Sequence, residues 1–209
     1  MTRPIIASLF GSTPIAMALD YAQTMLTAEL PTEAQAEVAA GGAVARSDAE
    51  RFTIHRGVAV VPVRGLLTAN SFILERYLGW ATYFGLIQTM NELAANADVT
   101  AVVIEGDSPG GYVTGIAGAA QAIAACAAVK PVHALVNPLA ASGGYWLASQ
   151  CRDITMTPGS VVGSIGVAVM ASAPVQPDMR GDQNYVLTST NARAKRPNPS
   201  TEVSIGAQN

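Results

Sequence analysis

The sequence predicts an α/β fold with a largely parallel sheet. From about residue 51 onward, short runs rich in β-branched residues alternate with longer amphipathic or alanine-rich stretches. Glycines follow two of the apolar runs, at Gly65 and Gly110, where a strand would turn toward the next element. This alternation is typical of strands joined by helical crossovers, which make neighbouring strands parallel.

The first half of this domain supplies two strands and a helix. Residues 58–63 (Val-Ala-Val-Val-Pro-Val) and 99–105 are apolar runs of the length of buried strands. Residues 82–95 place Leu86, Met90 and Leu93 on one stripe, which predicts an amphipathic helix.

The second half continues the pattern. A glycine-containing loop at 110 leads into an alanine-rich helix that ends near residue 129, and a short helix is predicted over 143–150. Apolar or β-branched runs predict strands at 132–136, 154–156, 167–170 and 185–189.

Residues 1–50 differ in composition and are predicted to be a helical arm and linker before the main domain, residues 51–209. Apolar residues recur at helical spacing from Pro14 to Leu30. Residues 31–50 are rich in Ala, Glu and Gly, and Gly41-Gly42 interrupts them, which predicts a linker or a weakly packed arm. Little sequence follows Lys195, so we expect the domain to be either C-terminally truncated or naturally short.

The composition excludes several classes of protein. With 209 residues, 50% of them hydrophobic, the chain can bury a substantial core. A net charge of −3 offers no basic field for nucleic acid. The two cysteines, Cys126 and Cys151, form neither a disulfide framework nor a metal-ligand pattern, so we expect a reducing compartment and no metal or organic cofactor.

No membrane span is expected. Residues 108–129 carry no charge, but they are mostly Ala, Gly and polar residues, whereas a span needs roughly 20 strongly apolar residues. The apolar residues 5–10 stop at Gly11-Ser12-Thr13-Pro14, which argues against a secretory signal. The expected location is therefore the cytoplasm.

A glycine-rich turn follows the predicted strand 99–105, at residues 107–111 (Asp-Ser-Pro-Gly-Gly). Glycine lets backbone N–H groups approach a ligand closely, and such groups near a helix N-terminus suit a developing oxyanion. Gly110 and Gly111 are therefore candidate oxyanion donors. A plain strand-to-helix turn is the alternative interpretation.

Ser142 is the candidate nucleophile. It lies in Ala-Ala-Ser-Gly-Gly (140–144), some 30 residues after Gly110, again between a predicted strand and a predicted helix. Adjacent parallel strands end at the same edge of a sheet, so this serine and the Gly110–Gly111 turn should face one crevice. The N–H of Gly143 is a further candidate donor. Alternatively, Ser142 is only a helix N-cap.

A serine nucleophile needs a base, and the sequence limits the choice. Both histidines, His55 and His133, precede Ser142, and the downstream candidate is Lys195. Lysine acts as a base only when its amine is neutral, which burial in an apolar site favours. Ser164, flanked by Gly163 and Gly166, could fix the lysine amine by a hydrogen bond; otherwise Ser164 belongs to a tight turn and Lys195 is a surface charge.

Taken in order, these elements resemble the signal-peptide-peptidase A type of serine peptidase, family S49. The matching segments are 57–63, 107–115, 140–145, 162–167 and Lys195 before Pro197-Asn198-Pro199. The resemblance implies a ClpP/crotonase-like superhelix of ββα units and a Ser/Lys dyad. It makes Ser142 the nucleophile and Lys195 the general base. It also implies that Ser164 orients the lysine and that Gly110, Gly111 and Gly143 supply oxyanion N–H groups.

Within that family the chain resembles the phage minor capsid protein C or head-maturation branch. The N-terminal stretch around Pro14 and the lack of an expected membrane anchor carry this likeness, while residues 172–183 depart from the usual pattern. The resemblance implies an endopeptidase for extended polypeptides such as capsid, scaffold or portal proteins. It also implies a homo-oligomer in the host cytoplasm or procapsid.

Four alternatives stay open at this point. One is peptide degradation of the signal-peptide-peptidase type, and another is a ClpP-like Ser/His/Asp peptidase, which would need a histidine from before Ser142. A crotonase-type acyl-CoA enzyme would share the fold without the Ser/Lys pair. A capsid component could use the fold for assembly only.

Overall fold

A computed structural model describes residues 4–9, 15–17, 24–39, 51–166, 168–173 and 183–188. The chain divides into two units, Met1–Gly163 and Ser164–Asn209. The boundary near residue 50 that the composition suggests stays a prediction.

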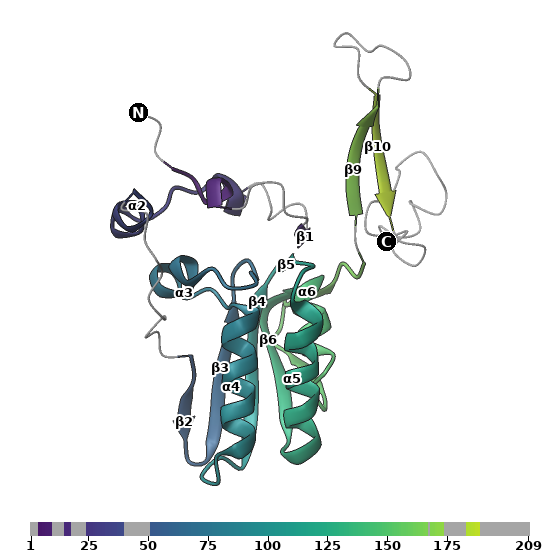
Figure 1. Cartoon of the computed structure of the whole chain (residues 1–209). Coiled ribbons are helices and arrows are strands. Elements are labelled where there is room, and N and C mark those ends of the chain that lie inside the picture. The colour runs from purple at the N-terminus through teal and green to yellow at the C-terminus, as the bar shows by residue number, and fades with distance from the viewer. Residues whose placement is uncertain are drawn as a thin grey trace. The chain divides into compact units, whose positions relative to one another are not determined.

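The first unit is built on a six-stranded sheet (Figure 1). Its order is β2 (Thr53–His55), β3 (Val58–Arg64), β4 (Ala101–Ser108), β6 (Val132–Ala141) and β7 (Ile154–Met156), and β8 (Val161–Gly163) also pairs with β6. The strands from β3 onward are parallel, whereas β2 is an antiparallel edge strand. The α/β class with a largely parallel sheet is thus confirmed, and the mixed sheet with helices agrees with the ClpP/crotonase-like expectation.

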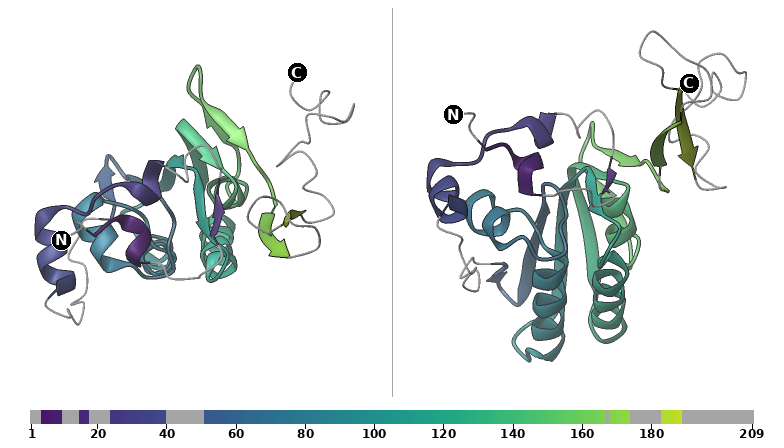
Figure 2. Two further views of the ribbon diagram at one scale, coloured as in Figure 1. Left: turned by 90° about the horizontal axis from the view of Figure 1, so that it is seen from above. Right: turned by 45° about the horizontal axis from the view of Figure 1, so that its top comes forward.

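Two long helices, α4 (Tyr83–Ala95) and α5 (Ile116–Val129), pack side by side on one face of the sheet (Figure 2, left). Thr82 caps α4, since its hydroxyl accepts a hydrogen bond from the N–H of Gly85 at 3.0 Å. The predicted stripe of α4 is buried in the core, and alanines on the buried side of α5 allow close approach to α4 and the sheet. The buried positions of these two helices include Leu86, Met90, Leu93, Ala119, Ala122 and Ile123.

Three further elements complete the first unit around these layers: α3 (Phe72–Leu78), β5 (Gly110–Tyr112) and α6 (Gly143–Ala148). The sequence pattern had predicted α6 but neither α3 nor β5.

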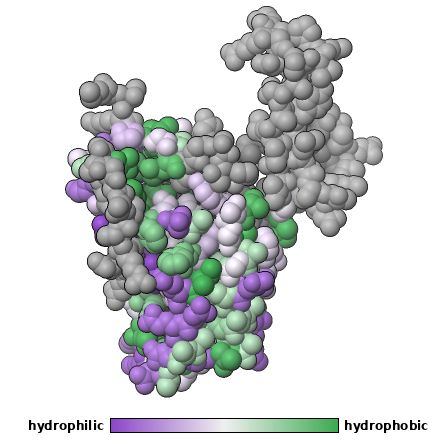
Figure 3. Space-filling model, viewed as in Figure 1, coloured by the Kyte–Doolittle hydropathy of each residue, from purple (hydrophilic) through white to green (hydrophobic). Residues whose placement is uncertain are grey.

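On the face seen in Figure 3, hydrophilic side chains gather at the lower end of the unit. The C-terminal turn of α4 lies at that end, where Asn91, Glu92 and Asp98 are exposed. None of the helices in the described ranges combines the length and apolarity that crossing a membrane requires.

The N-terminal arm differs from the prediction of one long helix followed by a linker. Ile15–Met17 is a strand, β1, which pairs antiparallel with β5; residues 24–27 are helical, and 10–14 and 18–23 lie outside the described residues. Thr32–Ala39 is the helix α2 rather than linker, while 40–50 lie outside the described residues. The spacing of apolar residues favoured a helix at residue 15. Such a local pattern carries no information about a strand partner almost 100 residues away, at Gly110–Tyr112.

The arm is packed rather than loose. Ile6 of the short 3-10 helix η1 (Ile6–Leu9), together with Leu30 and Ala34, is buried against Leu66 and Leu74 of the α3 region. This small cluster is distinct from the main core, and it anchors the arm to the α3 region.

The second unit contains an antiparallel hairpin of β9 (Ala168–Ala173) and β10 (Gln183–Thr188). Ala168 is paired with Thr188 and Ala173 with Gln183. The strands expected at 167–170 and 185–189 therefore exist within the described residues, with the second beginning two residues earlier.

Candidate active site

The loops after β4 and β6 meet at one edge of the sheet, as their parallel register requires. Ser108 at the end of β4 pairs with Ala140 near the end of β6. A Cβ placed on Gly143 would lie 3.5 Å from the amide nitrogen of Gly111 and 3.6 Å from the Cα of Gly110. The serine loop and the glycine loop are therefore in contact.

Ser142 lies on a sharp turn between β6 and α6. Its φ of 52° and ψ of −114° are unusual for a residue with a side chain. Its N–H donates to the carbonyl of Gly163 at 2.7 Å, which ties the turn to the end of β8. Ser142 is buried and occupies the N-cap position of α6, but its hydroxyl makes no capping hydrogen bond, so capping does not account for the serine side chain. Strain of this kind persists where the surroundings fix it, and it is common at functional sites.

Small residues let the two loops approach. A Cβ on Gly144 would come 2.9 Å from the carbonyl oxygen of Ser108, and Ala140 and Ala141 are buried behind the turn. A larger side chain at any of these positions would push the serine loop away from β4.

Ser108 is a supporting residue that the sequence reasoning did not single out. Its buried hydroxyl donates to the carbonyl of Gly65 at 2.7 Å and accepts from the N–H of Gly110 at 3.1 Å. It thereby fixes the start of the glycine loop against the end of β3. Its place directly before Pro-Gly-Gly, at the predicted end of a strand, is the signal that could have indicated this role.

The glycine loop presents the backbone of Gly111 rather than that of Gly110. The N–H of Gly110 is used by Ser108. Leu67 lies on one side of β5, since its N–H donates to the carbonyl of Gly110 and its carbonyl accepts from the N–H of Tyr112. Because backbone groups alternate along a strand, the N–H and carbonyl of Gly111 face the opposite side, toward β1.

Tyr83 holds β5 from the helical layer. Its hydroxyl donates to the carbonyl of Tyr112 at 2.6 Å, and burial raises the pKa of this phenol far above its usual value, so it stays a neutral donor. Before the loop, burial raises the pKa of Asp107, while the nearby Arg64 opposes that shift. Arg64 itself pairs with Glu105 at 2.5 Å.

Neither histidine can serve Ser142 within this unit. His133 lies at the beginning of β6, where its Nδ1 is 2.8 Å from a carboxylate oxygen of Asp153, whereas Ser142 follows the end of the same strand. At about 3.3 Å per residue over nine residues, the two are up to roughly 30 Å apart. His55 is paired with Val58, the first residue of β3, and so also lies at the far end of the sheet. This geometry excludes a Ser/His pair inside the first unit.

Lys195, the predicted base, lies outside the described residues. Ser164, the predicted partner of that lysine, directly follows β8 as the first residue of the second unit, with a φ of 52°. Their assignments therefore stay predictions.

Other reactive groups offer no competing site. Among the described residues, no group of three or more His, Cys, Asp or Glu side chains could hold a metal ion. Burial raises the pKa of Cys151 to about 12 and also raises that of the buried Cys126, so both thiols stay protonated at neutral pH.

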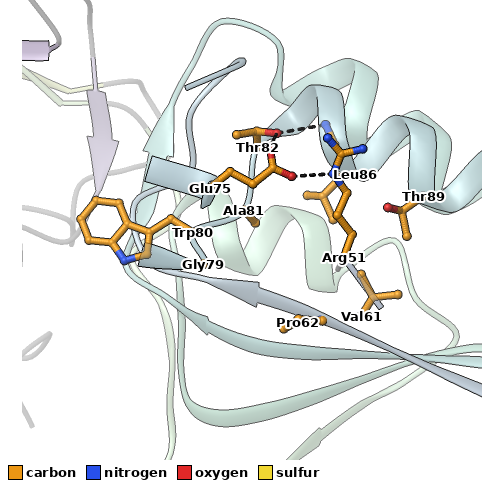
Figure 4. Close-up of a pocket in the computed structure, with 11 residues that line it drawn as sticks. Arg51, Val61, Pro62, Glu75, Gly79, Trp80, Ala81, Thr82, Leu86 and Thr89 are labelled. Atoms are coloured by element: carbon orange, nitrogen blue, oxygen red, sulfur yellow. Dashed lines mark hydrogen bonds and ion pairs between the residues drawn. The ribbon is translucent and has the colours of Figure 1, made fainter. Parts of the chain in front are cut away.

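A separate pocket of about 50 Å³ lies between α3, α4 and the segment before β2 (Figure 4). The Nε of Arg51 and the Oε1 of Glu75 are 2.5 Å apart there, and the guanidinium also donates to Gln88 at 2.8 Å. The hydroxyl of Thr82 donates to the second oxygen of Glu75 at 3.3 Å. These groups satisfy one another, which indicates a structural role.

Comparison with known proteins agrees with this geometry. Residues 124–174, which include Ser142 and Ser164, match the family model described as Peptidase family S49. The "Capsid assembly protease C" of Escherichia phage lambda is 35% identical over 124 residues, which are 59% of this chain and 28% of that protein. The "Head-tail preconnector protein GP5" of Enterobacteria phage P21 is 34% identical over 131 residues, 63% of this chain and 26% of that protein. The chain thus spans about a quarter of the length of these two relatives.

Among solved structures, an enoyl-CoA hydratase/isomerase family member is 24% identical with a TM-score of 0.43, and the match covers 54% of this chain and 48% of that one. An enoyl-CoA hydratase from Mycobacterium avium subsp. paratuberculosis K-10 is 22% identical with a TM-score of 0.43, covering 57% and 51% of the two chains. The resemblance that the ordered motifs predicted is confirmed by the family match and the phage sequences: the chain is similar to the S49 peptidases over residues 124–174 and to the two phage proteins over about 60% of its length.

Proposed function

We propose that the chain is a serine endopeptidase in which Ser142 is the nucleophile and Lys195 the general base. The observation that carries this proposal is the turn at Ser142. A serine with φ of 52° precedes a helix, and Gly143 on that helix packs against Gly110 and Gly111. A strained strand-to-helix turn of this kind projects a hydroxyl toward a bound carbonyl.

The N–H groups of Gly111 and Gly143 are the proposed oxyanion donors. Gly143 is the first residue of α6, so its N–H has no partner within that helix. Of the three glycines that the sequence suggested, Gly110 is the least suitable, because its N–H already donates to Ser108. Two donors on facing loops can hold the oxygen of a tetrahedral intermediate between them.

The reaction then follows from these groups. The neutral amine of Lys195 removes the proton of the Ser142 hydroxyl, and the oxygen attacks the substrate carbonyl. The amine returns the proton to the leaving nitrogen as the peptide bond breaks, which leaves an ester on Ser142. Water, deprotonated by the same amine, hydrolyses the ester and restores both residues. Ser164 is proposed to orient the amine.

The proposed substrates are extended segments of capsid, scaffold or portal proteins during phage head assembly, in the host cytoplasm or the procapsid. The phage relatives support this choice through their printed names, which refer to capsid assembly and to a head-tail preconnector. A "Protease 4" of Salmonella typhi is 41% identical over 70 residues, 33% of this chain and 11% of that protein, and favours general peptide degradation as the second candidate. We also propose that the chain acts as a homo-oligomer.

The test compares wild type with Ser142→Ala and Lys195→Ala on an unfolded polypeptide and on the capsid and scaffold proteins of the same phage. Removing either member of a unit of this kind should lower the cleavage rate by at least about 10³-fold. Ser149→Ala is the matched control, because the hydroxyl of this exposed serine makes only local hydrogen bonds, donating to the carbonyl of Trp146 and accepting from the side chain of Gln150. Its rate should stay within twofold of wild type.

Three results would change the assignment. Full activity of Lys195→Ala would require a different base. Absence of cleavage by wild type, together with no labelling of Ser142 by a fluorophosphonate, would favour the assembly role without catalysis. Cleavage of the unfolded polypeptide but not of capsid or scaffold proteins would favour general degradation.

A further inference from the structure

The strand β1 covers the edge of the glycine loop that carries Gly111, one of the proposed oxyanion donors. Ala16 lies directly opposite Gly111, while Ile15 and Met17 lie opposite Tyr112 and Gly110. Leu67 occupies the other side of β5 through the carbonyl of Gly110 and the N–H of Tyr112. The alternation of an antiparallel ladder therefore makes Ala16 and Gly111 the pair whose backbone groups face each other.

In this arrangement the N–H of Gly111, one of the two proposed oxyanion donors, is paired with β1. The carbonyl that faces it is that of Ala16, in a backbone segment that runs antiparallel to β5. A polypeptide substrate that adds a strand to the same edge would need the same N–H and carbonyl of Gly111. The segment Ile15–Met17 and such a substrate therefore exclude each other.

The rest of the arm anchors this strand. Ile5 pairs with Glu29, the N–H of Ile6 donates to the carbonyl of Ala28 at 2.9 Å, and the N–H of Leu30 donates to the carbonyl of Pro4 at 3.1 Å. These bonds bring the two ends of the arm together, on either side of β1 in the sequence. The apolar cluster of Ile6, Leu30 and Ala34 fixes this base against the α3 region.

We propose that Ile15–Met17 is an intrachain occupant of the substrate strand position, which inhibits the site until an extended polypeptide displaces it. The inference rests on the proposed function, because it takes the Gly111 edge to be the substrate edge. The ligand class is an extended polypeptide that pairs through its backbone. Its natural competitor is the chain's own residues 15–17.

The test measures binding rather than catalysis. All proteins are full chains carrying Ser142→Ala, so that no cleavage occurs, and the probe is a fluorescein-labelled peptide of residues 12–20. Ala16→Pro is added to one of them, because proline removes the N–H that faces Gly111 and obstructs the ladder. The dissociation constant of the probe should fall at least tenfold relative to the Ser142→Ala parent.

Met17→Pro is the matched control. The N–H of residue 17 faces away from β5, so proline removes no hydrogen bond of this ladder. A proline at position 17 also restricts residue 16 to an extended backbone, which residue 16 already has in β1. Its dissociation constant should stay within threefold of the parent. Equal affinity in all three proteins, with the same far-ultraviolet circular dichroism, would overturn the proposal. So would equal tightening by both prolines, since a general loosening of the arm would then explain the result.

A second measurement separates this inference from the proposed function. With Ser142 restored, Ala16→Pro should cleave an unfolded polypeptide at least fivefold faster than wild type, whereas Met17→Pro should match wild type. If Ala16→Pro tightens peptide binding but no protein cleaves, the peptidase assignment fails and the occupied strand edge stands. If wild type cleaves and Ala16→Pro changes neither binding nor rate, the inhibition fails alone.

Discussion

Gly111 lies where the backbone of Leu67 leaves no room for a Cβ, so only glycine fits there without a shift of the backbone. A Cβ at this position would lie 2.0 Å from the carbonyl oxygen of Leu67 and 2.6 Å from its carbonyl carbon, both of them backbone atoms in the core. The same residue presents its N–H to the opposite side of β5. The close approach of Leu67 therefore holds the proposed oxyanion donor in place.

We expect Gly111→Ala to lower the free energy of unfolding by about 3 kcal/mol or more, because two backbone segments must separate to admit the methyl group. Gly118→Ala is the control, since a Cβ there, in the first turn of α5, would meet only the end of Ile87 at 3.4 Å. It should be neutral or stabilising by up to about 1 kcal/mol. Urea unfolding of both variants checks this, and similar stabilities would contradict the contact with Leu67.

At the residue scale, the candidate site could be predicted in part. Ser142, Gly110 and Gly111 followed from glycine spacing and from the rule that parallel strands end at one edge. The preference for Gly111 over Gly110 could not be predicted, because it depends on Ser108 and Leu67, whose bonds form only in the folded chain. No pattern around Lys195 shows where its amine lies, so that assignment still depends on the resemblance.

A largely buried ion pair joins α3 to the segment before β2. Glu75 of α3 is only 5% exposed and bonds both Arg51, before β2, and Thr82, which caps α4. One carboxylate therefore connects three segments. The site edge depends on this, because the loop between β3 and α4 carries Leu67 beside the glycine loop.

Glu75→Ala should lower the free energy of unfolding by about 3 kcal/mol, since it leaves the Arg51 guanidinium partly buried without its carboxylate. Glu92→Ala, on the exposed face of α4, is the matched control and should stay within about 0.5 kcal/mol of wild type. Chemical denaturation monitored by circular dichroism measures both. An equal effect of the two substitutions would show that the buried pair has no special role in stability.

At the element scale, local periodicity found the strands and helices whose apolar faces are buried in the main core, such as β3, α4 and α5. It was wrong for Ile15–Met17, where spacing favoured a helix but pairing with β5 decides the conformation. It also missed α2, because an alanine- and glutamate-rich sequence predicts a linker or a weakly packed arm, whereas Ala34 is buried. In each case a distant partner, invisible to a local pattern, supplies the stabilising contact.

At the scale of the whole molecule, the family match crosses the division between the two units. Residues 124–174 begin in α5 and end just beyond β9. Ser142 thus belongs to the first unit, whereas Ser164 and Lys195 belong to the second. The residues that the proposed function assigns to the reaction are therefore distributed over both units of the chain.

We expect the purified chain to form a homo-oligomer, with a mass that is a whole multiple of the 21.5 kDa protomer. Trp146 of α6 is 45% exposed, and exposed tryptophan is enriched at protein interfaces. Light scattering coupled to gel filtration, at about 50 µM protein, measures the mass. A value near 21.5 kDa at that concentration would rule out a stable assembly.

The pairing of Ile5 with Glu29 also sets the concentration that an incoming polypeptide needs to displace β1. A strand tethered to its own partner by short stretches of chain experiences an effective concentration on the order of millimolar. A free polypeptide at micromolar concentration would seldom replace it. Segments held at millimolar density would exchange with it readily, so under the proposed function the timing of cleavage would follow local crowding rather than bulk abundance.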